Sequence, residues 1–353
     1  MPRFHALTVA DIHRTTADCA VVTLDVPAEV REDFRFRQGQ YLTLRTELDG
    51  EEVRRTYSLC SSPTEGKWSV AIKRIDGGLF STFANHDLQV GDALEALPPA
   101  GDFHVPLDPA RARHYVAFAA GSGITPILST IRAHLEGEPE STFQLFYVNR
   151  TVASIILKEE LEALKNRFLD RLEVHHFLTR EQRNVPLFNG RLDADKLRTI
   201  FRTLCPVERV DHCFICGPRE MIFLVRDEIT AAGLDPESVH YELFYSGEDP
   251  PPRRPRAARP DGIPVTLIDG GKEFHLSFGD AHDNLLDAAL AAGADLPYAC
   301  KGGVCSTCKC RVLDGSVEMH INYALEPAEV AAGYVLSCQA VPTSDQLKID
   351  FDV

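Results

Sequence analysis

Basic residues are scarce in this chain of 353 residues: 37 Lys and Arg stand against 52 Asp and Glu, and the formal net charge is −15. Proteins that bind nucleic acids or anionic membranes need basic surface, so the composition argues against both as partners. Ten cysteines are too few for a disulfide scaffold at this length. The longest uncharged run, from His114 to Ile131, contains two Gly, one Pro and several hydroxyl groups, which favours strand, loop and helix over a membrane span.

The N-terminal stretch MPRFHALTVADIHR has neither the basic start nor the long apolar run of a signal peptide. We therefore expect a cytoplasmic protein, in which thiols stay reduced and clustered cysteines bind metal or carry out redox chemistry.

One segment divides the chain. Between Ser246 and Gly262, five of the seventeen residues are Pro and four are Arg, with almost no apolar side chains. Such a segment cannot bury a core, so it predicts an extended linker over 246–262. The 91 residues at 263–353 hold 13 acids and 5 bases, which is a charge of −8 and more than half of the total. Together with the length, this division predicts two or three domains.

Two hydrophobic patterns precede the linker. Residues 1–108 contain short stretches with apolar residues at every second position, separated by turn signals such as Asp49-Gly50, and this predicts a small antiparallel β-barrel. Residues 109–245 alternate strand-like and helix-like stretches, which predicts a parallel sheet with helices on both faces. The five strands expected in that sheet are HYVAFAAG, FQLFYVN, LEVHHFLT, HCFICGP and VHYELF.

Four of the cysteines carry the strongest chemical signal. Cys300, Cys305 and Cys308, with 29 further residues before Cys338, have the plant-type spacing of a [2Fe–2S] cluster. One loop can supply three thiolates and a distant segment the fourth, while glycines in the loop let backbone amides approach the inorganic sulfides. A structural zinc site is the alternative, but it usually has two C-x2-C pairs and only Cys305 and Cys308 form one here. Cys310 is expected to be a bystander.

The residues around these cysteines, DLPYACKGGVCSTCKCRVLDGSVEM with YVLSCQA after them, resemble plant-type ferredoxin domains. The resemblance implies a β-grasp fold over 263–353, in which a helix at 283–294 packs across a mixed sheet. It also implies that Cys300 and Cys305 bind one iron of the cluster and that Cys308 and Cys338 bind the other.

A second motif, Arg55-Thr56-Tyr57-Ser58-Leu59, falls on a predicted strand of the barrel. An Arg can bond a phosphate through two N–H groups, a ring can stack and a hydroxyl can donate, although a Tyr in such a strand is more often a core residue. The segment Gly77-Gly78-Leu79-Phe80-Ser81-Thr82 can hold a pyrophosphate at the start of a helix.

With the barrel, these two motifs resemble the ferredoxin–NADP reductase family. The resemblance implies that Arg55 holds the FAD pyrophosphate, that Tyr57 stacks on the isoalloxazine and that Ser58 reaches toward its N5 atom. The remaining residues implied at the FAD are Leu59, Gly78, Ser81 and Thr82.

Two glycine-containing turns predict a nucleotide site at the carboxyl ends of the parallel strands. The turn Gly121-Ser122-Gly123-Ile124-Thr125-Pro126 opens a helix, where free N–H groups and the helix dipole favour a phosphate, although many such turns are only structural. With the later turn Cys216-Gly217-Pro218, it resembles the nicotinamide site of the same family. This resemblance places Gly121, Gly123, Thr125, Pro126, Gly217 and Pro218 at the cofactor, and Cys216, Glu242 and Phe244 near the hydride-transfer site. Phe244 is equally well explained as a core residue.

The end of the second parallel strand bears on cofactor choice. Tyr147-Val148-Asn149-Arg150-Thr151 offers no acid for a ribose 2′-hydroxyl, whereas Arg150 can pair with a 2′-phosphate. The alternative is an Arg that is merely solvated. We predict a preference for NADPH.

Three cofactors in one chain define an electron relay, since NADPH gives two electrons together, a [2Fe–2S] cluster accepts one at a time and a flavin connects the two. A reductase followed by a ferredoxin domain is similar to the reductase components of multicomponent oxygenases. The segments ADLPYACKGGVCSTCKCRVLDG, AAGYVLSCQA, GSGITP and FHALTVADI resemble the subgroup that serves phenylacetyl-CoA ring epoxidation in phenylacetate degradation. The resemblance implies transfer from NADPH to FAD, to the cluster, and to a di-iron oxygenase partner.

Two alternatives stay open. The partner could be another oxygenase, such as a ring hydroxylase or an alkane monooxygenase. The chain could also be a non-catalytic electron carrier or redox sensor with the cluster alone, which a purified protein without flavin absorption would favour. Arg219 and the linker arginines have no assigned role.

Overall fold

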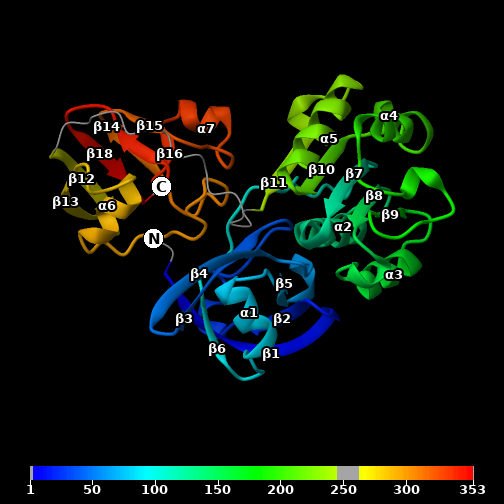
Figure 1. Cartoon of the computed structure of the whole chain (residues 1–353), viewed down its shortest axis with the longest axis horizontal. Coiled ribbons are helices and arrows are strands. Elements are labelled where there is room, and N and C mark those ends of the chain that lie inside the picture. The colour runs from blue at the N-terminus through cyan, green and yellow to red at the C-terminus, as the bar shows by residue number, and fades with distance from the viewer. Residues whose placement is uncertain (1–2, 245–261, 353) are drawn as a thin grey trace. The chain divides into compact units, whose positions relative to one another are not determined.

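The computed structural model describes residues 3–244 and 262–352. They form two compact units, one made of residues 5–53 and 57–244 and the other made mostly of residues 262–352 (Figure 1). Apart from Gly262, the predicted linker at 246–262 lies outside the described residues. None of the helices in the described ranges is long and apolar enough to cross a membrane.

The first unit contains a six-stranded antiparallel sheet with the order β4-β3-β6-β1-β2-β5. Its core holds buried aliphatic and aromatic side chains, among them Leu7, Val22 and Phe34. The sequence predicted a small antiparallel β-barrel; here the end strand β5 meets the segment after β4 through one bridge, between Leu59 and Val70. The strands are β1 (His5–Thr16), β2 (Cys19–Asp25), β3 (Tyr41–Leu48), β4 (Glu51–Ser58), β5 (Trp68–Lys73) and β6 (Ala93–Ala96), and helix α1 (Leu79–His86) follows β5.

A five-stranded parallel sheet with the order β11-β10-β7-β8-β9 follows in the same unit, as predicted. The chain builds outward from β7 first to one side and then to the other, so the carboxyl ends of β7, β8 and β10 border the crevice where such sheets bind ligands. Its strands are β7 (His114–Ala120), β8 (Thr142–Asn149), β9 (Leu172–Leu178), β10 (His212–Gly217) and β11 (Val239–Leu243). Its helices are α2 (Ile124–Gly137), α3 (Lys158–Arg167), α4 (Ala194–Thr203) and α5 (Arg219–Ala231).

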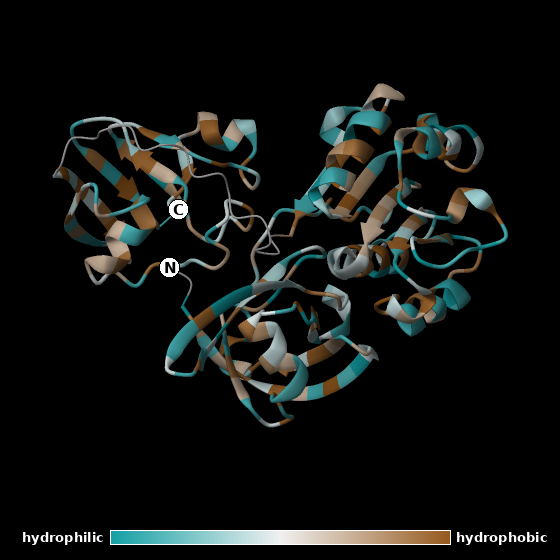
Figure 2. Ribbon diagram, viewed as in Figure 1, coloured by the Kyte–Doolittle hydropathy of each residue, from teal (hydrophilic) through white to brown (hydrophobic). Residues whose placement is uncertain are grey.

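Helices cover both faces of this sheet. Alternate side chains of a strand point to opposite faces. Tyr115 and Ala117 belong to the core cluster that includes residues of α2 and α3, whereas the ring of Phe118 lies 6.3 Å from that of Phe201 on α4. Figure 2 shows the hydrophobic residues that run along these strands.

The second unit has a five-stranded mixed sheet with the order β13-β12-β18-β14-β16, in which β12 and β18 are parallel and the other pairs antiparallel. The predicted helix at 283–294 is shorter than expected: Asn284 caps the start of α6 (Leu285–Ala291) by accepting the amide of Asp287, and Gly293 follows its end with a φ of 88°. The strands are β12 (Ile263–Asp269), β13 (Lys272–Phe278), β14 (Lys309–Asp314), β15 (Val317–Met319), β16 (Tyr334–Leu336), β17 (Ala340–Pro342) and β18 (Leu347–Asp350), with α7 at Pro327–Ala331.

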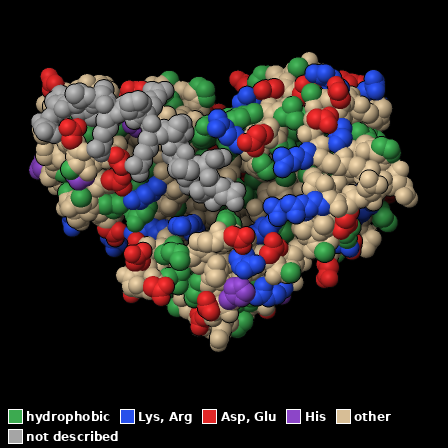
Figure 3. All heavy atoms as spheres, in the orientation of Figure 1, with side chains coloured by type: hydrophobic (Ala, Val, Ile, Leu, Met, Phe, Trp, Pro, Cys, Tyr) green, Lys and Arg blue, Asp and Glu red, His purple; other side chains and the backbone are tan. Residues whose placement is uncertain are grey.

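On the face drawn in Figure 3, basic and acidic side chains are interspersed, so the acidic excess of the sequence does not gather there as one acidic patch.

Candidate functional site

The end of strand β4 meets the last strand of the parallel sheet. Ser58, the final residue of β4 and 5% exposed, donates a hydrogen bond to Oε2 of Glu242 on β11 over 3.0 Å. Glu242 in turn is the register partner of Cys216 on β10. The sequence predicted four residues beside the reacting atoms. The fold brings three of them together, Ser58, Cys216 and Glu242.

Burial changes the acid–base behaviour of this cluster. It raises the pKa of Glu242 from 4.5 to about 8, although the hydrogen bond from Ser58 acts in the opposite direction. Burial likewise raises the pKa of the Cys216 thiol well above its ordinary value. Glu242 can thus hold a proton at neutral pH, and Cys216 is a neutral side chain.

The fourth predicted residue, Tyr57, precedes Ser58 on β4. Its half-buried ring lies 5.5 Å from the ring of Phe80 on α1, measured between centroids. Arg55 is exposed two residues earlier, with an N–H group bonded to the carbonyl of Arg54. A half-buried ring beside an exposed guanidinium has the chemistry that an isoalloxazine and its pyrophosphate need.

The start of helix α1 completes a phosphate cradle. Gly78 is its N-cap, and a Cβ there would lie 2.6 Å from Oγ of Ser81 and 3.1 Å from the carbonyl of Ile75, so a larger residue would have to displace the Ser81 side chain. The first amides of α1 have no partner within the helix and Thr82 is exposed. These features fit an anionic group.

Two residues implied at the FAD, Ser81 and Leu59, have buried side chains. The hydroxyl of Ser81 is buried, accepting the amide of Ile75 over 3.1 Å and donating to the carbonyl of Gly78 over 3.2 Å. Leu59 is 0% exposed in the core of the antiparallel sheet, and its amide donates to the carbonyl of Gln40. These bonds shape the cradle from within, because neither side chain reaches its surface.

The two glycine turns touch through their backbones. A Cβ on Gly123 would lie 2.1 Å from the carbonyl oxygen of Cys216 and 2.9 Å from the amide nitrogen of Gly217. A Cβ on Gly217 would lie 3.0 Å from Cβ of Ala120, and Gly121 has a φ of 54°, in the left-handed region. The crevice between β7 and β10 is therefore lined by backbone, which lets a pyrophosphate approach closely.

The other predicted nucleotide residues frame this crevice. Thr125 is buried, and its hydroxyl donates to the carbonyl of Ser122 over 3.0 Å, while Pro126 lies beside it in the first turn of α2. Pro218 is the N-cap of α5. Arg150 is exposed directly after β8, and Phe244 is 37% exposed directly after β11.

Three residues near this crevice were not found from the sequence. The hydroxyl of Tyr147 donates to the carbonyl of Gly121, the amide of Arg180 donates to the carbonyl of Arg150, and a carboxylate oxygen of Glu181 accepts the amide of Val152. Arg180 and Glu181 follow β9, and a search of the ends of all five strands, instead of the first two, would have found them.

The four cysteines of the cluster motif gather in the second unit. Cys305, Cys308 and Cys338 are at most 6% exposed and Cys300 is half-buried. The thiols interact as two pairs, Cys300 with Cys305 and Cys308 with Cys338, which coincide with the pairs that the ferredoxin resemblance assigns to the two irons. Hydrogen bonds from Cys305 and from loop amides, including that of Gly302, lower the pKa of Cys300, whereas the same pairing and burial raise the pKa of Cys305.

The loop backbone supports the same chemistry. Lys301, Gly303 and Ser306 all have positive φ values, of 49°, 76° and 48°, so the loop curls and turns amides inward. Within residues 3–244 and 262–352, no three or more His, Cys, Asp or Glu side chains are arranged to hold one metal ion. Two thiol pairs with inward amides fit a binuclear cluster with two protein ligands on each iron.

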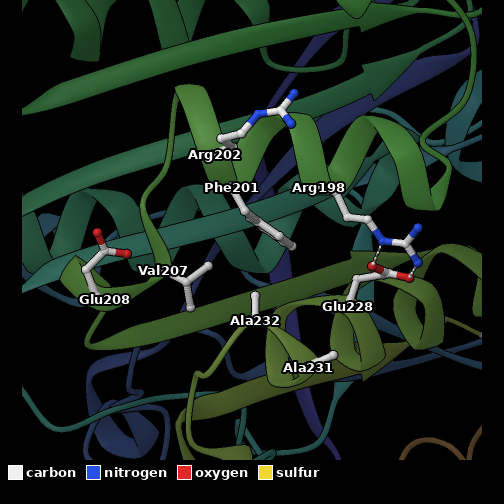
Figure 4. A pocket seen from close by; sticks show the side chains of 8 residues that line it. All are labelled: Arg198, Phe201, Arg202, Val207, Glu208, Glu228, Ala231 and Ala232. Atoms are coloured by element: carbon white, nitrogen blue, oxygen red, sulfur yellow. Dashed lines mark hydrogen bonds and ion pairs between the residues drawn. The ribbon is translucent and has the colours of Figure 1, made fainter.

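A hollow of about 340 Å³ lies elsewhere, between α4 and α5 (Figure 4). Arg198 and Glu228 span its rim with two hydrogen bonds of 3.0 and 2.9 Å, and Phe201 contributes apolar surface. None of the residues predicted from the sequence lines it, so the candidate chemistry lies at the crevice and the cysteine loop.

Three family models match the chain in sequence order. An oxidoreductase FAD-binding domain matches residues 6–105, an oxidoreductase NAD-binding domain matches residues 118–227, and a 2Fe-2S iron-sulfur cluster binding domain matches residues 267–343. The antiparallel sheet, the parallel sheet and the mixed sheet thus correspond to one domain each.

Whole-length relatives agree with this arrangement. The chain is 43% identical over 354 residues to one of the subunits of 1,2-phenylacetyl-CoA epoxidase from Escherichia coli (strain K12), covering 100% of this chain and 99% of the relative. It is 37% identical to the ferredoxin reductase component of 3-ketosteroid-9-alpha-monooxygenase from Rhodococcus rhodochrous, covering 98% and 96%. The solved structure of phthalate dioxygenase reductase is 26% identical and matches with a TM-score of 0.59, covering 99% and 98%. The chain belongs to the family of oxidoreductases that act as reductase components of oxygenases and join an FAD-binding, an NAD-binding and a C-terminal [2Fe–2S] ferredoxin domain.

Proposed function

We propose that this protein is the NADPH-dependent reductase that supplies electrons to a di-iron oxygenase for epoxidation of the aromatic ring of phenylacetyl-CoA. The observation that carries the proposal is the 43% identity to a phenylacetyl-CoA epoxidase component over the full length of both chains. The proposed domain boundaries are 1–108, 109–245 and 263–353, with a linker at 246–262, and each family-model match falls inside one of the three domains.

When bound, FAD takes two electrons as hydride from a nicotinamide and passes them singly to a [2Fe–2S] cluster. The chain's own residues bind and orient these groups. Arg55 and the amides at the start of α1 would hold the FAD pyrophosphate, and Tyr57 would stack on the ring system. Cys300, Cys305, Cys308 and Cys338 would hold the two irons.

Ser58 and Glu242 would orient the reacting atoms. The hydrogen bond between them, 3.0 Å long, fixes the Ser58 hydroxyl at the end of β4. Burial raises the pKa of Glu242 to about 8, which favours a carboxyl group that holds a proton without placing a second negative charge beside the nucleotide. Cys216 contributes a neutral side chain and a backbone carbonyl at the wall of the crevice.

The preference for NADPH rests on two arginines. Arg150 follows β8 and Arg180 follows the neighbouring strand β9, and their backbones are joined by a hydrogen bond of 2.8 Å. Both side chains are exposed, and a guanidinium group can pair with a 2′-phosphate. An acid, Glu181, follows Arg180 in the loop after β9, and one of its oxygens accepts the amide of Val152 over 3.1 Å.

The cofactor test compares kcat/KM for NADPH and NADH with ferricyanide as the acceptor. A charge-assisted hydrogen bond contributes about 1.5–3 kcal/mol, so Arg150→Ala should lower kcat/KM for NADPH by about 10- to 150-fold and leave that for NADH nearly unchanged. Arg202→Ala, which removes an exposed Arg from α4, is the matched control. Equal use of NADH by the wild type would overturn the NADPH preference.

The test of the partner is reconstitution. Purified protein is mixed with the oxygenase component of a phenylacetyl-CoA epoxidase, and NADPH oxidation is compared with consumption of phenylacetyl-CoA. We expect oxidation to depend on both the substrate and the oxygenase. Coupling to a steroid monooxygenase or ring hydroxylase instead would assign the protein to another oxygenase, in agreement with its 37% identity to the steroid enzyme's reductase.

A further inference from the structure

Tyr147 lies beneath the glycine turn of the nucleotide crevice. It is 0% exposed on β8, and its hydroxyl donates to the carbonyl oxygen of Gly121 over 2.9 Å and lies 3.3 Å from the carbonyl oxygen of Ile156. A buried hydroxyl needs a partner, but either carbonyl alone would satisfy it. The position between two carbonyls joins the turn after β7 to the segment before α3.

That segment holds a strained residue. Leu157 follows Ile156 and has φ 57° and ψ 34°, a left-handed conformation that is unfavourable for a residue with a Cβ. Its amide donates to Oγ1 of Thr15 over 2.7 Å, and its side chain is 2% exposed. Thr15 belongs to β1 of the antiparallel sheet, so the flavin-domain sheet fixes the conformation of this segment.

The contacts form one continuous path. It runs from Thr15 through the backbone of Leu157 and Ile156 to the hydroxyl of Tyr147 and ends at the carbonyl of Gly121. Both ends lie within the same compact unit. The path therefore connects the flavin-domain sheet to the turn that opens the nucleotide crevice.

The hydrogen bond from Tyr147 to the carbonyl of Gly121 also orients the neighbouring amide group. A trans peptide is planar, so the carbonyl of Gly121 and the amide N–H of Ser122 point in opposite directions. The hydroxyl of Tyr147 holds that carbonyl toward the sheet, and the amide of Ile124 also bonds to it. The N–H of Ser122 is thereby aimed away from the buried Tyr147, toward the open side of the turn.

We propose that Tyr147 is a positioning residue for the dinucleotide: it sets the Gly121–Ser122 peptide so that its N–H faces the pyrophosphate, and Thr15 supports this setting from the flavin domain. The proposal rests on the proposed function, because it requires the glycine turn to bind NADPH. It adds a residue that acts through the backbone of another and touches no reacting atom.

The test uses Tyr147→Phe, which keeps the ring and removes the hydroxyl. The full-length protein with its cofactors is titrated with NADP⁺ and with NAD⁺ by calorimetry. A neutral hydrogen bond contributes about 0.5–1.5 kcal/mol, so the dissociation constant of the preferred nucleotide should rise about 2- to 12-fold. KM should rise by a similar factor while kcat with ferricyanide stays within about twofold, since a residue that only positions the nucleotide does not enter the chemical step.

Two further variants separate positioning from loss of stability. Tyr115→Phe removes the hydroxyl of another fully buried Tyr, on β7, whose partners are Glu138 and Arg113 rather than the glycine turn. It should lower the thermal midpoint and leave the dissociation constant unchanged. Thr15→Val removes the acceptor of the Leu157 amide and should also weaken nucleotide binding. In the double variant with Tyr147→Phe, the two effects on the dissociation constant should be less than additive.

A wild-type dissociation constant in Tyr147→Phe, or equal weakening in Tyr115→Phe, would overturn the proposal while leaving the proposed function intact. Failure of the wild type to bind either nucleotide would overturn both.

Discussion

Replacement of Gly123 by Ala tests whether the nucleotide site depends on backbone contact between the two glycine turns. The new Cβ would lie 2.1 Å from the carbonyl oxygen, 2.5 Å from the carbonyl carbon of Cys216 and 2.9 Å from the nitrogen of Gly217. A carbon–oxygen contact needs about 3.3 Å, so the turns must separate by roughly 1.2 Å. All three atoms belong to the backbone and cannot rotate away.

This displacement has a kinetic consequence. A shift of about 1 Å at a site that aligns two reactants can lower the rate by about 100-fold. We therefore expect Gly123→Ala to lower kcat/KM for NADPH-driven ferricyanide reduction by about 100-fold. Over-packing should lower the free energy of unfolding by about 1–3 kcal/mol. Flavin and iron content, measured by absorption and iron analysis, should stay at wild-type levels.

Gly137→Ala is the matched control, since both glycines adjoin or belong to α2. A Cβ on Gly137 would lie 3.2 Å from Cδ1 of Leu107, the end of a flexible side chain that can move. Its kinetics should stay within about twofold of wild type. If Gly123→Ala also kept wild-type kcat/KM, the two turns would not need their close contact, and the assigned nucleotide site would be wrong.

The remaining predictions concern the cluster and Glu242. Cys338→Ser should abolish the [2Fe–2S] absorption and electron paramagnetic resonance signals but keep bound flavin and NADPH-driven ferricyanide reduction. The control is Cys310→Ser, which alters a nearby thiol that is 0% exposed and should keep the cluster. The reverse outcome would mean that Cys310 is the fourth ligand. Burial raises the pKa of Glu242 from 4.5 to about 8. Between these pH values the native state binds more protons than the unfolded state. The free energy of unfolding therefore falls as the pH rises through this range. Thermal unfolding should show Glu242→Gln gaining stability relative to wild type from pH 5 to 8, whereas parallel pH curves would mean that this carboxyl group is not buried in the holoprotein.

The sequence was most informative where function needs a local pattern. The iron ligands must come from one tight loop, so three of the four cysteines lie within nine residues and their spacing is diagnostic. The parallel strands are buried on both faces, so they appear as nearly continuous apolar runs that are easy to find. Family comparison then confirmed the three domains that these patterns predict.

Residues whose role depends on distant partners could not be found in the same way. Strand β1 alternates buried and exposed residues only over its first half and carries exposed Asp, His and Arg residues in its second half, yet it pairs with both β2 and β6. Helix α3 begins at Lys158, after Leu157 in a left-handed conformation whose amide bonds to Thr15, a partner 142 positions away in the chain. The hydrogen bond from the amide of Ile75 to the hydroxyl of Ser81 depends on the fold of this turn and could not be found from the motif alone.

The contact between Gly123 and Cys216 also has a consequence for biosynthesis. The two residues are 93 positions apart in the chain, and β10 enters the sheet directly beside β7. During translation the glycine turn therefore emerges long before the strand that completes its wall. The nucleotide crevice forms only after β8 and β9 have been laid down on the opposite side, whereas the antiparallel sheet has all six of its strands once residue 96 has left the ribosome. A nascent chain would thus be able to fold its flavin sheet well before it acquires any site for the nucleotide that reduces the flavin.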